Sequence, residues 1–110
     1  MPNPPDPVPL VVLTTLGDRS QAVAFVRNLV ADRLVACGTV LDDAVSIYRW
    51  KDDITEEREV LVILKTTSAR WDSLQDTIAE RHPYDIPELL ALPIRAGLEP
   101  YLRWLTAETD

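Results

Sequence analysis

The 110-residue chain is long enough for one domain with a modest hydrophobic core, and its net charge of -7, from 18 acidic and 11 basic residues, argues against nucleic-acid binding. No basic cluster is available to neutralise a run of phosphates. A single cysteine excludes an internal disulfide, and no stretch approaches the roughly 20 apolar residues that span a bilayer, so we predict a cytoplasmic protein that does not bind membrane.

The first predicted elements are a strand and a helix. Residues 1–9 hold five prolines and no apolar face, so we predict a flexible leader there and a single domain at residues 10–110. The continuous, β-branched run at residues 10–15 predicts a strand in the centre of a sheet. Asp18 and Gln21 have capping-box spacing, and the apolar residues after them recur with the helical period, which predicts an amphipathic helix of about four turns.

After Cys37 the apolar pattern changes to the period of two that is typical of strands. Residues 45–50 alternate, residues 51–53 supply turn chemistry, and residues 59–66 form a second, longer apolar strand. This pattern predicts a long β-hairpin. Because its second arm is apolar on both faces, we expect either helices on one side and sheet on the other, or a neighbouring subunit, to cover it.

The C-terminal third predicts a helix, a strand and a closing helix. Thr67 or Ser68 can cap the first of these helices, and Pro83 stops it. The apolar residues 89–94 predict the last main strand, and Pro100 suits the first turn of the closing helix. The order β-α-β-β-α-β with a terminal helix predicts an α+β domain, a ferredoxin-like sandwich with a long hairpin between its second and third strands.

Five stretches carry distinctive motifs: Ala-Cys at 36–37, Ser-Ile-Tyr-Arg-Trp at 46–50, Ile-Leu-Lys-Thr-Thr at 63–67, His-Pro-Tyr-Asp-Ile-Pro-Glu at 82–88 and Tyr-Leu-Arg-Trp at 101–104. In this combination the chain resembles the CutA family, the divalent-cation tolerance proteins. The resemblance implies a ferredoxin-like fold, a PII-like homotrimer joined through the hairpin, and a link to tolerance of copper and other divalent metals, with no established enzymatic reaction. The chain departs from the family pattern at residues 38–43 and at the hairpin tip, residues 51–53.

Cys37, His82 and Glu88 have the donor chemistry of a Cu(II) or Zn(II) site, and the resemblance implies metal binding at these positions. The Irving–Williams order favours Cu(II) among the divalent cations. No local pair brings two donors together, so the site would form by folding or between subunits. Each residue also has a structural alternative: Cys37 as a small buried residue, His82 as a partner of the last helix carbonyls, and Glu88 as an ion-pair partner of Lys65 or an arginine.

A second set of residues suggests a ligand cleft. The resemblance places Tyr48, Trp50, Lys65, Tyr84 and Glu88 near a cleft between subunits. A lysine can hold an anion and aromatic rings can stack on an organic molecule, so this set predicts a small-molecule ligand or a partner protein, as in a PII-like adaptor. The alternative is that the aromatic residues only fill the subunit interface.

Catalytic motifs are scarce in the sequence. Three separated glycines exclude a P-loop and a dinucleotide fingerprint, and no serine nucleophile motif is present. Cys37 as a nucleophile with His82 as its base is the one catalytic alternative. We therefore expect a trimeric binding protein that is not an enzyme and needs no organic cofactor. Its function would be divalent-cation binding, PII-like ligand sensing, or a structural role that affects metal tolerance indirectly.

Overall fold

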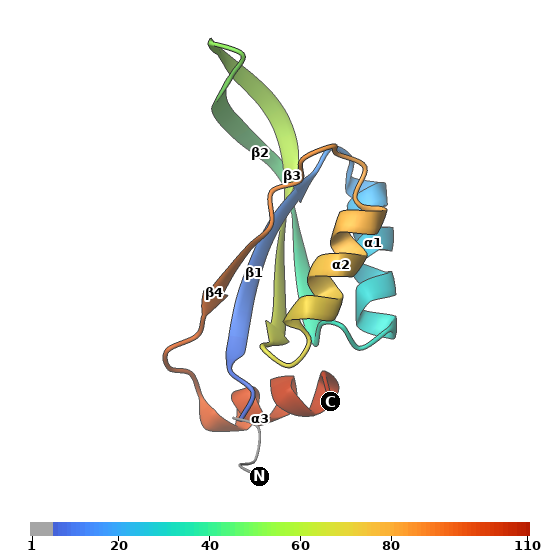
Figure 1. Ribbon diagram of the computed structural model, residues 1–110, viewed down its shortest axis with the longest axis vertical. Coiled ribbons are helices and arrows are strands. Elements are labelled where there is room, and N and C mark those ends of the chain that lie inside the picture. Colours follow the sequence, from blue (N-terminus) through green and yellow to red (C-terminus); the bar gives the residue numbers. More distant parts are fainter. Residues whose placement is uncertain (1–5) are drawn as a thin grey trace.

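A computed structural model describes residues 6–110, and it forms one four-stranded antiparallel sheet with two helices packed on one face and a third at its end (Figure 1). The sheet order is β2-β3-β1-β4, which confirms the predicted ferredoxin-like arrangement. Within these residues, no helix is both long and apolar enough to cross a membrane. The elements are β1 (Pro9–Leu16), α1 (Arg19–Ala31), β2 (Cys37–Trp50), β3 (Asp53–Thr67), α2 (Trp71–Arg81), β4 (Leu90–Pro93) and α3 (Glu99–Glu108).

The core lies between the sheet and the helices α1 and α2. The strand β1 is central, because it pairs with β3 over its whole length and with β4 from Leu10 to Leu13. Alternate side chains of β1 and β3 point towards the helices and are fully buried there, as the period of two requires. The fully buried core residues include Val12, Leu16, Leu29, Val62, Leu64, Leu74 and Ile78.

The N-terminal segment and the start of α2 differ in detail from the sequence-based expectation. Residues 1–5 of the predicted leader lie outside the described residues, while Val8 is held by Ser68, whose backbone N–H and hydroxyl both bond to the backbone of Val8 at 2.8 Å. The predicted side-chain cap of α2 is wrong, because the N-cap is Arg70 and it makes no side-chain cap hydrogen bond. The Ser68 hydroxyl is used to fix the start of β1 instead.

The hairpin formed by β2 and β3 extends beyond the rest of the domain and gives it a longest dimension of 51 Å (Figure 1). Lys51 and Asp52 connect the arms with φ of 50° and 69°, the two positive values of a type I′ hairpin turn. Near the tip, Ile47 and Ile54 are 63% and 70% exposed. The hairpin thus carries apolar side chains away from the domain's own core.

A bulge interrupts the hairpin where the chain departs from the family pattern. The register shifts between Leu41 and Ala44, so Asp42 and Asp43 have no partners on β3. Asp43 has a φ of 61°, which an aspartate tolerates better than most residues. The two carboxylates pair with arginines, Asp42 with Arg19 at 3.2 Å and Asp43 with Arg58 at 3.6 Å.

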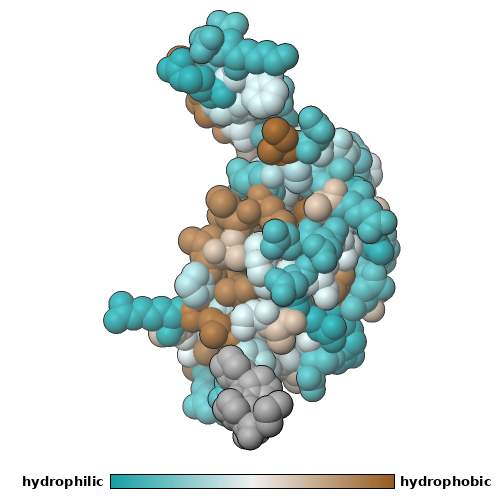
Figure 2. Space-filling model, in the orientation of Figure 1, coloured by the Kyte–Doolittle hydropathy of each residue, from teal (hydrophilic) through white to brown (hydrophobic). Residues whose placement is uncertain are grey.

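The sheet face opposite α1 and α2 is apolar and largely open. Leu90 and Leu92 of β4 are 54% and 47% exposed, and Leu61 and Ile63 of β3 are only half-buried. Figure 2 shows a brown apolar area on the side where β4 and β1 lie. An apolar area of this kind is typical of an interaction surface, and the predicted trimer stays a prediction here.

Helix α3 is fastened to the domain through its C-terminal end. Arg33, which follows α1 with a φ of 60°, donates from Nη2 to the carbonyl of Ala107 at 3.1 Å. Arg70 donates from Nε to the carbonyl of Thr109 at 2.7 Å. Both arginines therefore bind carbonyls at the negative end of the helix dipole. Leu105 completes the attachment by being fully buried.

Gly38 is predicted to be required for the packing of α1 on β2. A Cβ at this position would lie 2.5 Å from Cγ1 of Val26 and 2.8 Å from Cδ2 of Leu64, so Gly38→Ala should lower the free energy of unfolding by about 1–3 kcal/mol. Urea unfolding would measure the loss. Gly17→Ala is the control, because its Cβ would meet only the Tyr84 hydroxyl at an ordinary 3.5 Å. Equal stability of Gly38→Ala and the natural chain would contradict this packing.

Candidate functional site

His82 joins the end of α2 to the sheet. His82 is 7% exposed, and its Nε2 lies 2.8 Å from the carbonyl oxygen of Thr15. The strand β4 pairs with β1 only as far as Leu13, so the imidazole reaches β1 in the stretch beyond the end of this pairing. On its other side, Nδ1 accepts a hydrogen bond from the backbone N–H of Tyr84 at 3.1 Å.

These two hydrogen bonds determine the chemical state of the ring. Because the Tyr84 amide can only donate, Nδ1 must accept, and Nε2 must carry the proton that it donates to Thr15. The ring also makes edge contacts with Tyr84 and Phe25, at centroid distances of 4.8 and 6.0 Å. Neither nitrogen has a free lone pair for a metal ion in this arrangement, and His82 instead fixes the start of the loop that carries Tyr84 to Glu88.

Tyr84 connects this loop to β3. Its hydroxyl donates to Oε2 of Glu59 at 3.0 Å, and Glu59 is only 8% exposed. Burial, followed by the hydrogen bond and negative charge of Glu59, raises the pKa of Tyr84 to about 12. The phenol is therefore a stable donor to the carboxylate over the whole physiological range.

A pocket of about 610 Å³ opens between the hairpin and the loop. Tyr48 and Trp50 of β2 form an aromatic wall, and Tyr84 forms part of the opposite side. Burial raises the pKa of Tyr48 too, with a further contribution from its hydrogen bond to Glu57. The charged residues of the lining are all acidic, namely Glu57, Glu59, Asp85 and Glu88, and Thr15 and Ser46 add neutral polar groups.

The structure brings together four of the five residues that were predicted for a ligand cleft. Tyr48, Trp50, Tyr84 and Glu88 all line this pocket. Lys65 does not, because it lies six residues from Glu59 along β3, or about 20 Å at the rise of an extended strand. It could reach such a pocket only from another copy of the chain.

The predicted metal donors are also separated in one chain. Cys37 pairs with Lys65 at the far end of the hairpin, where its Sγ is 3.8 Å from the Tyr101 hydroxyl and Lys65 Nζ is 5.9 Å from the centre of the Tyr101 ring. Glu88 is exposed at the pocket. Within residues 6–110 no three His, Cys, Asp or Glu side chains converge to hold a metal ion.

Sequence reasoning missed the acidic side of the pocket. Glu57, Glu59 and Asp85 were not predicted to line it. The hairpin register gives a usable signal for two of them, because it runs unbroken from the turn and pairs Glu57 with Ser46 and Glu59 with Ala44, on the same face as Tyr48. Asp85 lies in the loop between α2 and β4, where no strand partner places it.

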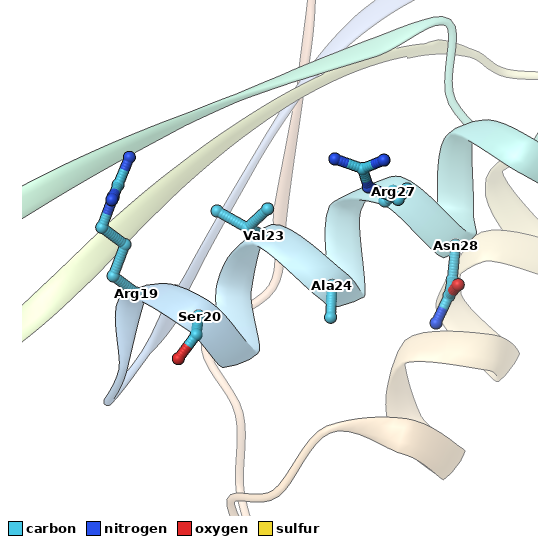
Figure 3. Close-up of a pocket in the computed structure, with 6 residues that line it drawn as sticks. All are labelled: Arg19, Ser20, Val23, Ala24, Arg27 and Asn28. Carbon is cyan, nitrogen blue, oxygen red and sulfur yellow. The ribbon is translucent and has the colours of Figure 1, made fainter.

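A second hollow lies on the outer surface of α1 and is lined by Arg19, Ser20, Val23, Ala24, Arg27 and Asn28. Figure 3 shows that Arg19, Val23 and Arg27 point to one side of the helix, whereas Ala24 and Asn28 point to the other. Arg19 is already paired with Asp42. The polar groups do not converge here, so this surface offers no candidate site.

The sheet order and the long hairpin define an α+β protein of the ferredoxin-like class. A family model described as CutA1 divalent ion tolerance protein matches residues 10–108. The chain therefore belongs to the CutA1 divalent ion tolerance family, as its motifs predicted.

Individual relatives agree with this assignment over nearly the full chain. The divalent-cation tolerance protein CutA of Thermus thermophilus is 38% identical over 99 residues, which cover 90% of this chain and 96% of that protein. Its solved structure has a TM-score of 0.89 at 37% identity and covers 93% of this chain and 99% of that one. CutA1 from Oryza sativa has the same TM-score at 31% identity, with 94% of each chain covered.

Tyr84 should make stability depend on pH in the alkaline range. Since folding raises its pKa from 10.0 to about 12, the stabilisation by the neutral phenol is complete below pH 10 and is lost as the pH rises towards 12. Urea unfolding at increasing pH, beside an ultraviolet titration of tyrosinate, would measure this loss. Tyr84→Phe is expected to remove this component of the pH dependence, and an unchanged profile would contradict the assignment.

Proposed function

We propose that this protein serves divalent-cation tolerance as a cytoplasmic homotrimer that binds a divalent cation directly and catalyses no reaction. The observation that carries this proposal is the distribution of donors and apolar surface in one chain. Cys37 and Glu88 lie at separate ends of the domain, and an open apolar sheet face extends beside them. Association of copies would cover this face and could bring donors of different copies together.

The exposed apolar side chains support the assembly. Leu90 and Leu92 project from the edge strand β4, and Ile47 and Ile54 project from the hairpin, all with about half or more of their surface exposed. A single small domain gains nothing from exposing this much apolar surface, whereas an obligate oligomer buries it. The resemblance to the family sets the expected number of copies at three.

The donor chemistry favours a cation such as Cu(II). The carboxylate of Glu88 is exposed and the thiol of Cys37 is partly accessible, whereas His82 would have to give up two hydrogen bonds to bind a metal. Thiolate and carboxylate ligands bind Cu(II) more strongly than the earlier divalent metals of the series. We therefore propose Cys37 and Glu88 as donors and a structural role for His82.

Light scattering followed by calorimetric titration with Cu(II) on the same sample tests this function. We expect a particle of three chains and stoichiometric binding, with Cys37→Ser and Glu88→Gln each lowering the affinity by about tenfold or more. His82→Ala should lower the free energy of unfolding by about 2 kcal/mol or more, because it removes a buried ring and two hydrogen bonds. A folded particle of single-chain mass at micromolar concentration would refute the assembly and the shared site.

A second candidate function is PII-like binding of a small molecule or a partner protein. The observation that favours it is the pocket of about 610 Å³, because it lies within the size range of small-molecule sites and combines aromatic walls with a few polar groups. Tyr48, Trp50, Tyr84 and Glu88 would contact the ligand in this reading.

A thermal-shift screen of metabolites tests the second candidate. We expect at least one compound to raise the melting temperature and Trp50→Ala to abolish that shift, since the indole supplies much of the contact area. The Lys65→Ala variant shows whether one chain forms the binding site or a second copy completes it. If one chain forms the site, the variant keeps the thermal shift. If Lys65 of a second copy completes the site, the variant loses the thermal shift. A screen without any shift would count against ligand binding.

A further inference from the structure

The pocket between the hairpin and the loop has one sign of charge. Glu57 and Glu59 reach it from β3, and Asp85 and Glu88 reach it from the loop. No lysine, arginine or histidine is among the residues that line it in the described chain. A lining of this kind repels anions and attracts cations, which is the opposite of the anion site that Lys65 would provide.

Glu59 is the informative member of this lining. It is 8% exposed, and its one hydrogen bond within residues 6–110 is the 3.0 Å bond from the Tyr84 hydroxyl to Oε2, while Oε1 takes no hydrogen bond there and is not among the fully buried atoms without a partner. The ion pairs found in this part of the chain involve Asp32, Asp42, Asp43 and Glu99, so no basic side chain neutralises Glu59. A buried carboxylate is costly unless a cation accompanies it. Burial is the main cause of the raised pKa of Tyr48 and of Tyr84, and the hydrogen bonds and negative charges of Glu57 and Glu59 add to it.

The shape of the pocket argues against a bare metal ion. A coordinated metal needs several donors converging on one point, and no three such side chains do so in the described residues. The volume of about 610 Å³ suits a larger molecule. Tyr48 and Trp50 add aromatic surface, and an aromatic face attracts ammonium and guanidinium groups through cation–π interaction.

We propose that this pocket binds a small organic cation, with an ammonium or guanidinium group paired with Glu59 and an apolar stem lying against Tyr48 and Trp50. The proposal rests on the second candidate function, small-molecule binding, and names its ligand class. The same cationic group can belong to a free amine or to a basic side chain of another protein. In both cases it supplies the positive charge that Glu59 lacks.

Calorimetry with the full chain tests the charge of the ligand. Putrescine, butanediol and succinate have four-carbon skeletons and carry positive, neutral and negative ends. We expect putrescine to bind and the other two not to bind. Glu59→Gln, which keeps an acceptor for the Tyr84 hydroxyl, should weaken putrescine by about tenfold or more, a change worth about 1.4 kcal/mol.

Matched variants keep the result specific. Glu80→Gln removes the same charge from an exposed position on α2 and should leave putrescine binding unchanged. If Glu59→Gln does not fold, Glu57→Gln replaces it, because Glu57 is exposed and lines the same pocket. If Glu80→Gln lowers the affinity for putrescine as much as the pocket variants do, the binding is non-specific attraction to negative charge. That result would overturn the proposal.

The remaining outcomes separate the ligand class from the candidate function. Binding of N-acetyl-arginine amide more tightly than putrescine supports the proposal and identifies a protein side chain as the source of the cation. If succinate or butanediol binds instead of putrescine, and Trp50→Ala abolishes that binding, the proposal of a cationic ligand is wrong. The second candidate function, small-molecule binding, would then still stand. Absence of binding by all four probes, together with an empty metabolite screen, overturns both.

Discussion

The arrangement of the pocket depends on one imidazole ring. His82 bonds to the carbonyl of Thr15 beyond the point where β4 stops pairing with β1, and it accepts the backbone N–H of Tyr84. These bonds tie the loop after α2 to the central strand and direct the Tyr84 hydroxyl to Glu59. A residue with the chemistry of a metal ligand thus serves as a structural link, and it helps to position the acidic groups that line the pocket.

The hairpin gives the domain its second defining property. Its tip projects from the core with Ile47 and Ile54 exposed, and Leu61 and Ile63 of β3 lie with Leu90 and Leu92 on the open face of the sheet. The same strands that form the pocket also carry this surface. Any partner that covered the open face would therefore approach the rim of the pocket.

The order of elements and the family could be predicted from sequence, because periodicity, proline positions and local motifs determine them. The pocket could be predicted only in part. The bulge at Asp42 and Asp43 shifts the hairpin register beyond Ala44, and this shift places Leu41 opposite Leu61. The bonding of both His82 nitrogens depends on where β4 ends, and the separation of Lys65 from the aromatic residues depends on strand length. Each of these is a long-range consequence of pairing that a local pattern does not contain.

The attachment of α3 has a practical consequence for handling the molecule. The strand β1 begins, and α3 ends, at the end of the domain farthest from the hairpin tip (Figure 1). Arg33 and Arg70 grip the last turn of α3, so a linker fused after Asp110 would leave from a rigid base. A molecule tethered to a surface there would present the hairpin tip to the surrounding solution.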